Sequence, residues 1–346
     1  MKKIAYFDAS VETPEEIILA ADLIPIRLFG NPTIGIDKAN EHIPPTHCVW
    51  ARNILEQAIE GFNDDDIKGV ISTHGCDCTN REFDIWLECV NIEFLFFLNA
   101  PLKRNKTALK FFIEDLKELK IQLEEYFHVK ITPEKLQKAI KKMNHIRDLL
   151  KEISEFRKKL ILRGSEFHAL VKEVQQRNKE EALKILQSKL KELKKKEPFT
   201  DNNPKKVLLT GSVIDDTEFI KFLEGLGFQI VIDDLCIGNK YFWSKVDESK
   251  EPIEALADYH LSKPIYSTKF PSYIRFETLI NLAREYNVDG VINIAQKFCE
   301  PVLYDHPYLN KKFKELEIPY LFVEMEYNRE SYKQLATRFE AFAEII

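Results

Sequence analysis

Two stretches of this chain, Gly69–Cys78 (GVISTHGCDC) and Gly290–Cys299 (GVINIAQKFC), carry most of the information on how it folds. Each begins with a run of β-branched and apolar residues, which is typical of a strand buried in a parallel sheet. Each then reaches a cysteine and continues through a helix-like segment into another apolar run, IEFLFFL or IPYLFVE. This repeated order predicts two similar α/β lobes that face each other, with cysteines at the cleft between them.

Eight short segments are expected to form the parallel sheets of these lobes. They are Ile4–Phe7, Ile24–Phe29, Val70–Thr73, Phe94–Leu98, Val207–Thr210, Phe228–Asp233, Gly290–Ala295 and Tyr320–Glu324. Pro25 lacks an N–H donor, so the second segment is expected at a sheet edge or bend. Between the first two segments, Thr13-Pro14-Glu15-Glu16 predicts the start of a helix with Thr13 as its N-cap.

The middle of the chain has a different pattern. After the cap Thr132-Pro133, apolar residues recur at helical spacing, and Ala182–Lys196 is expected to be another helix, rich in lysine and leucine. The lysine run that ends at Lys196 is interpreted as a solvated helix face. We therefore expect an N-terminal α/β lobe (residues 1–101), a helical segment that joins the lobes (102–200) and a C-terminal α/β lobe (201–346).

The composition favours a globular protein in a reducing compartment. The chain has 346 residues, 45% of them hydrophobic and 31% charged, with a net charge of -6. Mild acidity without a basic stripe argues against a nucleic-acid partner. No apolar run approaches the roughly 20 residues that span a membrane, and Asp8 and Glu12 interrupt the first apolar stretch, so no signal peptide is expected. The cysteines are too sparse for a secreted disulfide scaffold, so a cytoplasmic location is predicted.

The positions of the cysteines point to one site. Cys76, Cys236 and Cys299 each come shortly after an expected strand. Ligands of open α/β sheets bind outside the carboxyl ends of the strands, so thiols from distant segments should converge there. Such a set of thiolates suits an iron–sulfur cluster, whose irons are bound by cysteine thiolates. A set of only three cysteines would leave one iron free for a substrate. Cys48, Cys76 and Cys299 could supply that set.

The remaining cysteines leave alternatives open. Cys78 and Cys236 are further candidate ligands, or small buried side chains. Cys89 is interpreted as a structural thiol, since Trp86, Leu87 and Val90 suggest the apolar face of a helix. A zinc site is also considered, because His47 and His74 lie beside two of the cysteines, although Cys76-Asp-Cys78 lacks the usual two-residue gap. The sequence contains no GxxxxGK[ST] phosphate-binding loop, so no ATP site is expected.

At these residues the chain resembles the iron–sulfur subunits of 2-hydroxyacyl-CoA dehydratases and their relatives, the benzoyl-CoA reductases and double-cubane cluster proteins. The resemblance extends over nearly the whole length and rests on the order and spacing of several short motifs. These are Val11–Ala21 with Pro25–Leu28, Cys48–Arg52, Gly75–Asp77, Ile131–Leu136 with Asn144 and Arg147, Asp233–Gly238, Lys297–Cys299, Ile318-Pro319 and Thr337–Phe342.

The resemblance implies two flavodoxin-like lobes around a [4Fe-4S] cluster held by Cys48, Cys76 and Cys299. It also implies a homodimer or a heterodimer with a related subunit, and a separate ATP-hydrolysing activator that delivers one low-potential electron to an acyl-CoA thioester. The function expected from it is that of an oxygen-sensitive reductive dehydratase or reductase component. Two alternatives stay open: a double-cubane [8Fe-9S] reductase of small molecules, and a non-catalytic cluster carrier or redox sensor.

Overall fold

The computed structural model of the chain describes residues 2–7, 10, 12–62, 64–199 and 204–346. The described residues form eight strands, divided between two four-stranded parallel sheets. The first sheet has the order β2-β1-β3-β4 and the second the order β6-β5-β7-β8, so the two follow the same topology. The strands are β1 (Lys3–Phe7), β2 (Ile24–Arg27), β3 (Ile67–Thr73), β4 (Phe94–Leu98), β5 (Lys205–Gly211), β6 (Phe228–Asp233), β7 (Gly290–Gln296) and β8 (Tyr320–Met325). The prediction of two flavodoxin-like α/β lobes is therefore confirmed.

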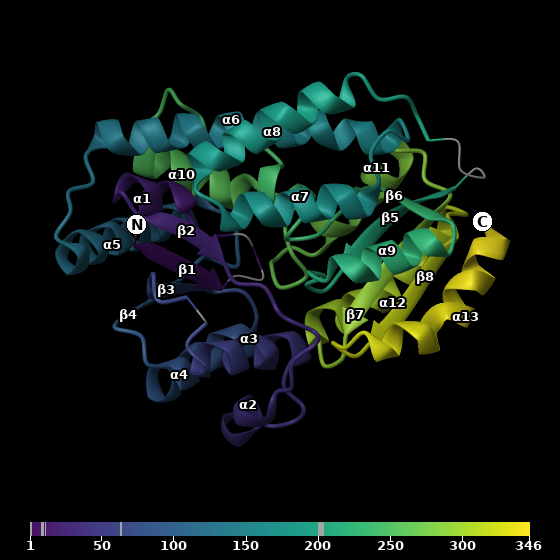
Figure 1. Cartoon of the computed structure of the whole chain (residues 1–346), viewed down its shortest axis with the longest axis horizontal. Helices are drawn as coiled ribbons and strands as arrows, with labels where there is room; N and C mark the ends of the chain where they lie inside the picture. Colours follow the sequence, from purple (N-terminus) through teal and green to yellow (C-terminus); the bar gives the residue numbers. More distant parts are fainter. Residues whose placement is uncertain (1, 8–9, 11, 63, 200–203) are drawn as a thin grey trace.

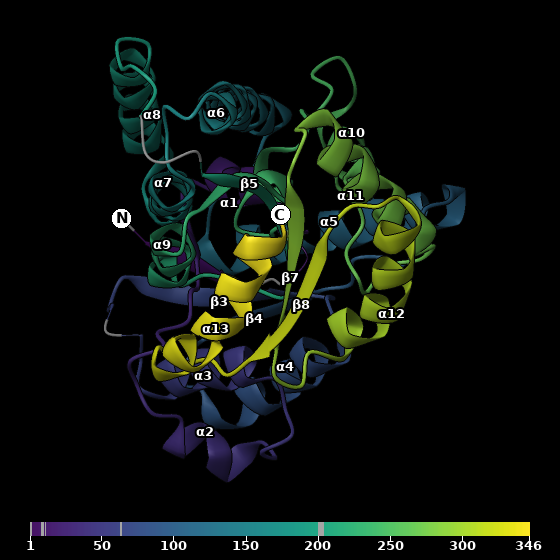
Figure 2. The same ribbon diagram turned by 90° about the vertical axis from the view of Figure 1, so that its right-hand side faces the viewer.

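Helices surround both sheets (Figures 1 and 2). They are α1 (Glu15–Ala20), α2 (Asp37–His42), α3 (Val49–Ile59), α4 (Asp77–Cys89), α5 (Lys106–Phe127), α6 (Pro133–Lys158), α7 (Gly164–Gln176), α8 (Lys179–Leu193), α9 (Thr217–Gly225), α10 (Pro252–Ser262), α11 (Tyr273–Glu285), α12 (Glu300–Glu315) and α13 (Glu330–Ile345), with a short 3₁₀ helix, η1 (Asn239–Phe242). Among the described residues, no helix is both long and apolar enough to span a membrane.

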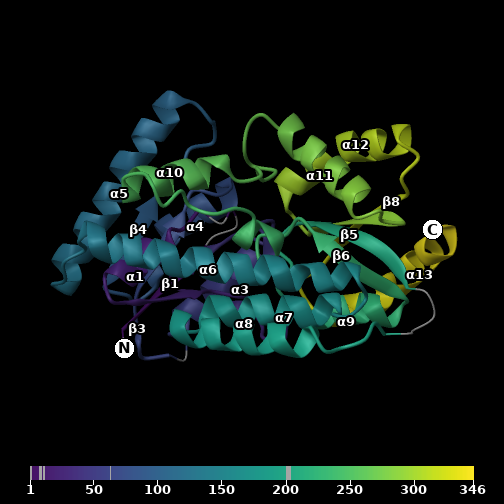
Figure 3. The ribbon, with the colours of Figure 1, turned by 90° about the horizontal axis from the view of Figure 1, so that it is seen from above.

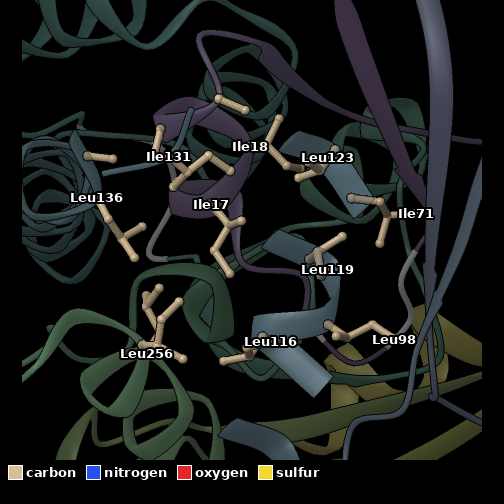
Figure 4. Close-up of a cluster of buried hydrophobic side chains, with 14 of the residues drawn as sticks. Ile17, Ile18, Ile71, Leu98, Leu116, Leu119, Leu123, Ile131, Leu136 and Leu256 are labelled. Carbon is tan, nitrogen blue, oxygen red and sulfur yellow. The ribbon is translucent and has the colours of Figure 1, made fainter. Parts of the chain in front are cut away.

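Alternate residues of the first strand enter different cores, as the pleat of a sheet requires. In β1, Ile4 and Tyr6 join the core beneath α1 and α5, whereas Ala5 and Phe7 join the core beneath α3 and α4. Figure 4 shows the first of these cores, which Leu116 of α5 shares with Ile71 of β3 and Leu98 of β4. Leu256 of α10 belongs to the same core, so a helix from the last third of the chain packs on the first lobe.

The helical segment crosses from one lobe to the other. Helices α6, α7 and α8 lie side by side and share one hydrophobic core (Figure 3). Helix α7 packs against β2 of the first sheet and β6 of the second. Thr132 caps α6 as predicted, since its side chain accepts a hydrogen bond from Lys135 N–H. Helix α8 begins at Lys179, three residues before its predicted start, because Asn178 provides the cap.

Two further local predictions have opposite outcomes. The prediction for Pro25 is confirmed: it lies in β2, an outer strand of the first sheet, where its missing N–H costs no ladder hydrogen bond. The prediction of Thr13 as an N-cap is wrong. Pro14 occupies the cap position of α1, and the Thr13 hydroxyl is instead 2.8 Å from the Thr73 hydroxyl at the end of β3. A tertiary hydrogen bond has taken the place of the local one.

Some positions with a sequence-based interpretation lie outside the described residues. These are Asp8, which interrupts the first apolar stretch, Val11, which begins the first resemblance motif, and residues 200–203 around the expected boundary at residue 200. The lysine run falls inside the described part, and Lys194, Lys195 and Lys196 are all exposed. The run is solvated as predicted, but these three lysines follow Leu193, the last residue of α8, and so lie beyond the helix.

Candidate metal centre

The three cysteines predicted to act together all occupy the cap position of a helix. Cys48 precedes α3, Cys76 precedes α4 and Cys299 precedes α12. The N-terminus of a helix carries a partial positive charge, which favours a thiolate over a thiol. Cys76 and Cys299 also follow the ends of β3 and β7, as the sequence pattern predicts.

The carboxyl ends of the two sheets face each other across this site. In the first sheet the chain passes from β1 to β2 at one edge and from β3 to β4 at the other, and β5 to β8 follow the same order in the second sheet. The two central strands of each sheet therefore flank a topological switch point. Residues from all four of these strand ends, Ser10, Cys76, Ser212 and Cys299, line one small cavity of about 50 Å³. The two switch points therefore form a single interlobe site.

A larger cavity of about 340 Å³ adjoins the small one. Cys76 and Cys299 line both cavities, whereas Cys48 and Cys78 line the larger and Cys236 the smaller. Of the six cysteines, all of which are described, five thus converge on this site. Cys89 lies elsewhere, half-buried against the core of the first lobe that contains Trp86.

The helix face around Cys89 differs in one respect from its prediction. Trp86 and Val90 are buried, but Leu87 is 56% exposed. At 100° per residue, Leu87 points away from the sheet that its two neighbours contact. The assignment of Leu87 to the apolar face is therefore wrong, although Cys89 itself packs as a structural thiol would.

Burial and mutual repulsion oppose ionisation of these thiols. Burial raises the pKa of Cys48, and the nearby sulfurs of Cys299 and Cys76 raise it further. Burial also raises the pKa of Cys299 to about 11, with Cys76 adding to the rise and the Ser212 hydroxyl opposing it. Several thiolates can therefore coexist here only beside a cationic group that offsets their charge.

One of the cysteines is held as a thiolate by its neighbours. The Cys78 thiol donates a hydrogen bond to Cys76, which lowers the pKa of Cys76 to about 6 and raises that of Cys78. The Thr79 hydroxyl and the first N–H groups of α4 also stabilise the Cys76 thiolate. Cys76 is thus the thiol that is most readily ionised, and Cys78 supports it.

The geometry does not favour a single zinc ion. Zinc holds thiolates at about 2.3 Å, so its ligand sulfurs lie within about 4 Å of one another. Within the described ranges, no three His, Cys, Asp or Glu side chains converge closely enough to hold one ion. His47 instead faces Glu82, with 3.9 Å between its Nε2 and the Glu82 carboxylate. A cluster binds each thiolate at a different iron and so accepts a wider separation.

Sequence reasoning missed several residues of the site. Ser10, Ser212 and the loop of Tyr266, Ser267 and Thr268 all line the small cavity. One signal was available at Gly211, where φ is +134° and a Cβ would overlap the carbonyl oxygen of Ile294. That glycine lets the end of β5 approach β7 closely, which brings Ser212 to Cys299. The loop of Tyr266 carries no comparable local pattern.

Arg52 illustrates how a motif position gains its meaning in the fold. It lies one helical turn after Cys48 and is buried, with its Nη1 2.9 Å from Asn40 Oδ1. Its Nε is also buried but has no hydrogen-bond partner among the described residues. A guanidinium in this position places positive charge beside the Cys48 sulfur.

Comparisons with known proteins identify the family of this chain. The family model of the 2-hydroxyglutaryl-CoA dehydratase D-component matches residues 10–346. The (R)-phenyllactyl-CoA dehydratase beta subunit of Clostridium sporogenes is 29% identical over 96% of this chain and 89% of its own length. The (R)-2-hydroxyglutaryl-CoA dehydratase beta subunit of Acidaminococcus fermentans is 24% identical over 96% and 89%. One subunit of the benzoyl-CoA reductase of Thauera aromatica is 24% identical over 100% and 91%.

These relatives are all subunits of dehydratases or of a reductase, so this chain is an enzyme component of one of these two types. The match extends over both lobes and the helical segment between them, and therefore over the whole site. The chain belongs to the 2-hydroxyglutaryl-CoA dehydratase D-component family.

Proposed function

We propose that this chain holds one [4Fe-4S] cluster through Cys48, Cys76 and Cys299 and acts as the electron-accepting component of a reductive dehydratase or reductase. The observation that carries the proposal is the convergence of these three helix-capping cysteines on one interlobe site. Their mutual repulsion requires a cationic partner, and iron bound to thiolate supplies that charge.

When bound, the cluster would supply single electrons at low potential to a substrate. The chain itself would hold the three thiolates at the larger cavity, which all three cysteines line, and would leave the rest of that cavity open to a ligand. At about 340 Å³, that cavity is in the size range of small-molecule sites. We propose an acyl-CoA thioester as its ligand, in line with the names of the relatives, with another small molecule as the alternative.

A single cubane is favoured over a double one. The cavity beside Cys236 measures about 50 Å³, room for about one or two water molecules at about 30 Å³ each. A second cubane there would have to displace Tyr266 or Ser10. A double cubane also needs more thiolates, and Cys89 is packed against Trp86 and its core rather than at the site.

We further propose two protein partners and a reducing compartment. Because the sequence has no phosphate-binding loop, the electron would come from a separate ATP-hydrolysing activator. A related subunit, in line with the names of the relatives, would cover the larger cavity. Exposed apolar residues support this: Leu102 and Tyr304 line that cavity with 39% and 75% exposure. The thiolates would remain reduced in the cytoplasm.

Anaerobic measurement of iron and sulfide per chain tests the proposal. We expect about four irons and about four sulfides per chain, no ATP hydrolysis by the chain alone, and an unchanged iron count in Cys78→Ala and Cys236→Ala. About eight irons, with losses in both variants, would favour the double-cubane reductase. A cluster that passes readily to an apo-acceptor would favour a carrier, and a chain purified anaerobically without iron would refute the proposal.

The Ser212→Ala variant should lower the reduction potential of the cluster. The Ser212 hydroxyl bonds to Cys299 while accepting from Gln296 N–H, and a hydrogen bond to a thiolate stabilises the reduced, more negative cluster. A bond to a charged group contributes about 1.5–3 kcal/mol, and about 59 mV corresponds to tenfold for one electron. Because only the difference in this energy between the oxidised and the reduced cluster changes the potential, a negative shift of some tens of millivolts is expected in an anaerobic redox titration. Ser212→Thr, which keeps the hydroxyl, is the control, and an equal shift in both variants would contradict the explanation.

A further inference from the structure

We propose that Asp215 is the positioning residue that fixes Cys48 of the first lobe relative to Cys299 of the second. This inference deepens the proposed function and rests on it. Asp215 follows β5 of the second sheet and is completely buried. Its carboxylate is nevertheless bonded mainly to the other lobe.

The hydrogen bonds of Asp215 cross between the lobes. Its Oδ2 accepts from Gly30 N–H and from the Trp50 indole N–H, both at 2.7 Å. Gly30 follows β2, and Trp50 lies in the first turn of α3, two residues after Cys48. Its Oδ1 accepts from the Tyr327 hydroxyl, and its backbone carbonyl accepts from Lys172 of α7. One residue thus joins segments from four parts of the chain.

The groups that Asp215 holds are rigid. Trp50 is 2% exposed and stacks on Phe7 of β1, with 5.4 Å between the ring centroids. Tyr327 follows β8 of the second sheet, yet it packs in the core of the first lobe with Trp50. Gly30 must be a glycine, because a Cβ there would overlap the Tyr327 hydroxyl. A shift of Asp215 would therefore be transmitted to Trp50 rather than absorbed between them.

The same loop reaches the other cysteine. Ser212, three residues before Asp215, bonds to the Cys299 thiol. The loop of residues 212–215 thus contacts Cys299 through Ser212. Through Asp215 it contacts Trp50 of α3, the helix that Cys48 caps. Because a cluster needs its thiolates at set positions, the length of this loop and the anchoring of Asp215 would set the separation of the two cysteines.

Asp216 provides a matched control. It is also a buried carboxylate, 6% exposed, and it accepts hydrogen bonds from Arg329, from the Tyr332 hydroxyl and from Glu218 N–H. All of these partners belong to the second lobe. Loss of Asp216 should weaken that lobe without releasing one lobe from the other.

The test compares iron release to a chelator under anaerobic conditions, together with the electron paramagnetic resonance spectrum of the reduced cluster. We expect Asp215→Ala to release iron about tenfold faster or more and to alter the spectrum, since three hydrogen bonds to a buried carboxylate are lost. Asp216→Ala should match the wild type in both readouts. Asp215→Asn keeps an acceptor for Gly30 and Trp50 and should restore most of the retention.

Equal rates of iron release from Asp215→Ala and Asp216→Ala would overturn the inference. The same holds if Asp215→Asn releases iron as fast as Asp215→Ala. If Asp215→Ala does not fold, Tyr327→Phe, which removes a single hydroxyl, replaces it and should speed release by a smaller factor; release at the wild-type rate from that variant would count against the inference.

Hydrogen exchange of the apo-protein separates this inference from the proposed cluster. Peptides that contain Gly30 and the start of α3 should exchange faster in Asp215→Ala than in Asp216→Ala, whether or not iron binds. Unchanged exchange there would overturn the positioning role. If the two variants show this difference but the wild-type chain contains no iron after anaerobic purification, the cluster is refuted and the link between the lobes stands.

Discussion

Replacing Cys76 by Ala is expected to remove most of the bound iron from the chain. Cys48, Cys76 and Cys299 come from three separate loops, so the two thiolates left behind chelate the cluster poorly. Cys76 should be the most sensitive of the three, because its thiolate is the one that its surroundings already stabilise. Iron content after anaerobic purification and the electron paramagnetic resonance spectrum measure the effect.

Cys89→Ala is the matched control for this prediction. Cys89 ends α4, the helix that Cys76 caps, but packs against the core around Trp86. Its loss should leave the iron content unchanged and cost about 1–2 kcal/mol of stability. An iron content and a spectrum of Cys76→Ala that match those of the wild type would contradict the assignment of the three ligands.

Replacing Arg147 by Met is expected to destabilise the fold by about 3–5 kcal/mol, because it leaves the carboxylate of Glu16 buried without its partner. The side chains of Arg147 on α6 and Glu16 on α1 are 5% and 1% exposed, and 2.5 Å separates the Arg147 Nη2 from the Glu16 Oε1. The Arg147 guanidinium also lies 4.4 Å from the ring centroid of Tyr259 on α10. Urea unfolding of the apo-protein at pH 7 measures the loss.

Two variants control for the position and for the charge. Asp148 follows Arg147 on α6 and pairs with Lys245 at the surface, so Lys245→Met should cost less than about 1 kcal/mol. Arg147→Met combined with Glu16→Gln removes both charges and should recover much of the lost stability. A double variant as unstable as Arg147→Met alone would show that shape, not charge, causes the effect.

The pH dependence of this pair has a defined sign. Burial would raise the pKa of Glu16, but the charge and the hydrogen bond of Arg147, together with the charge of His260, hold the pKa below its ordinary value of 4.5. A carboxylate with a lowered pKa contributes stability at neutral pH that is lost as the pH falls below its unfolded value. Arg147→Met removes the largest of the causes that lower this pKa, so burial becomes dominant and raises it, and that variant loses stability as the pH rises. The difference between the two proteins should therefore shrink from pH 7 to pH 4.

Some residues of the resemblance motifs lie far from the cysteines and contribute to the packing between the lobes. Asn144 and Arg147 belong to the helical segment, where sequence alone shows only a helix face. In the structure the Asn144 amide bonds to the Val246 carbonyl, 2.9 Å away, and Arg147 to Glu16. These residues tie α6 to both the first lobe and the last third of the chain. They therefore hold the lobes rather than the ligand.

The short-range patterns of the sequence were sufficient to predict the strands, the outer position of the strand that contains Pro25, and the placement of cysteines after strand ends. Strands buried on both faces require continuous β-branched runs, and a parallel sheet places everything that follows those runs at one edge. Pro25 marked an outer strand for a local reason, its missing N–H. The fold class and the positions of Cys76, Cys236 and Cys299 after strand ends could therefore be predicted from neighbouring residues alone.

Contacts between distant segments governed the rest. Thr13 bonds to Thr73 instead of capping its own helix, and α10 packs on the first lobe. Ser212 reaches Cys299 only because the second sheet brings β5 beside β7. Each of these outcomes depends on a partner that lies far along the chain. Periodicity carries no information about such distant partners, because it records only which residues share a face, and not what that face will meet.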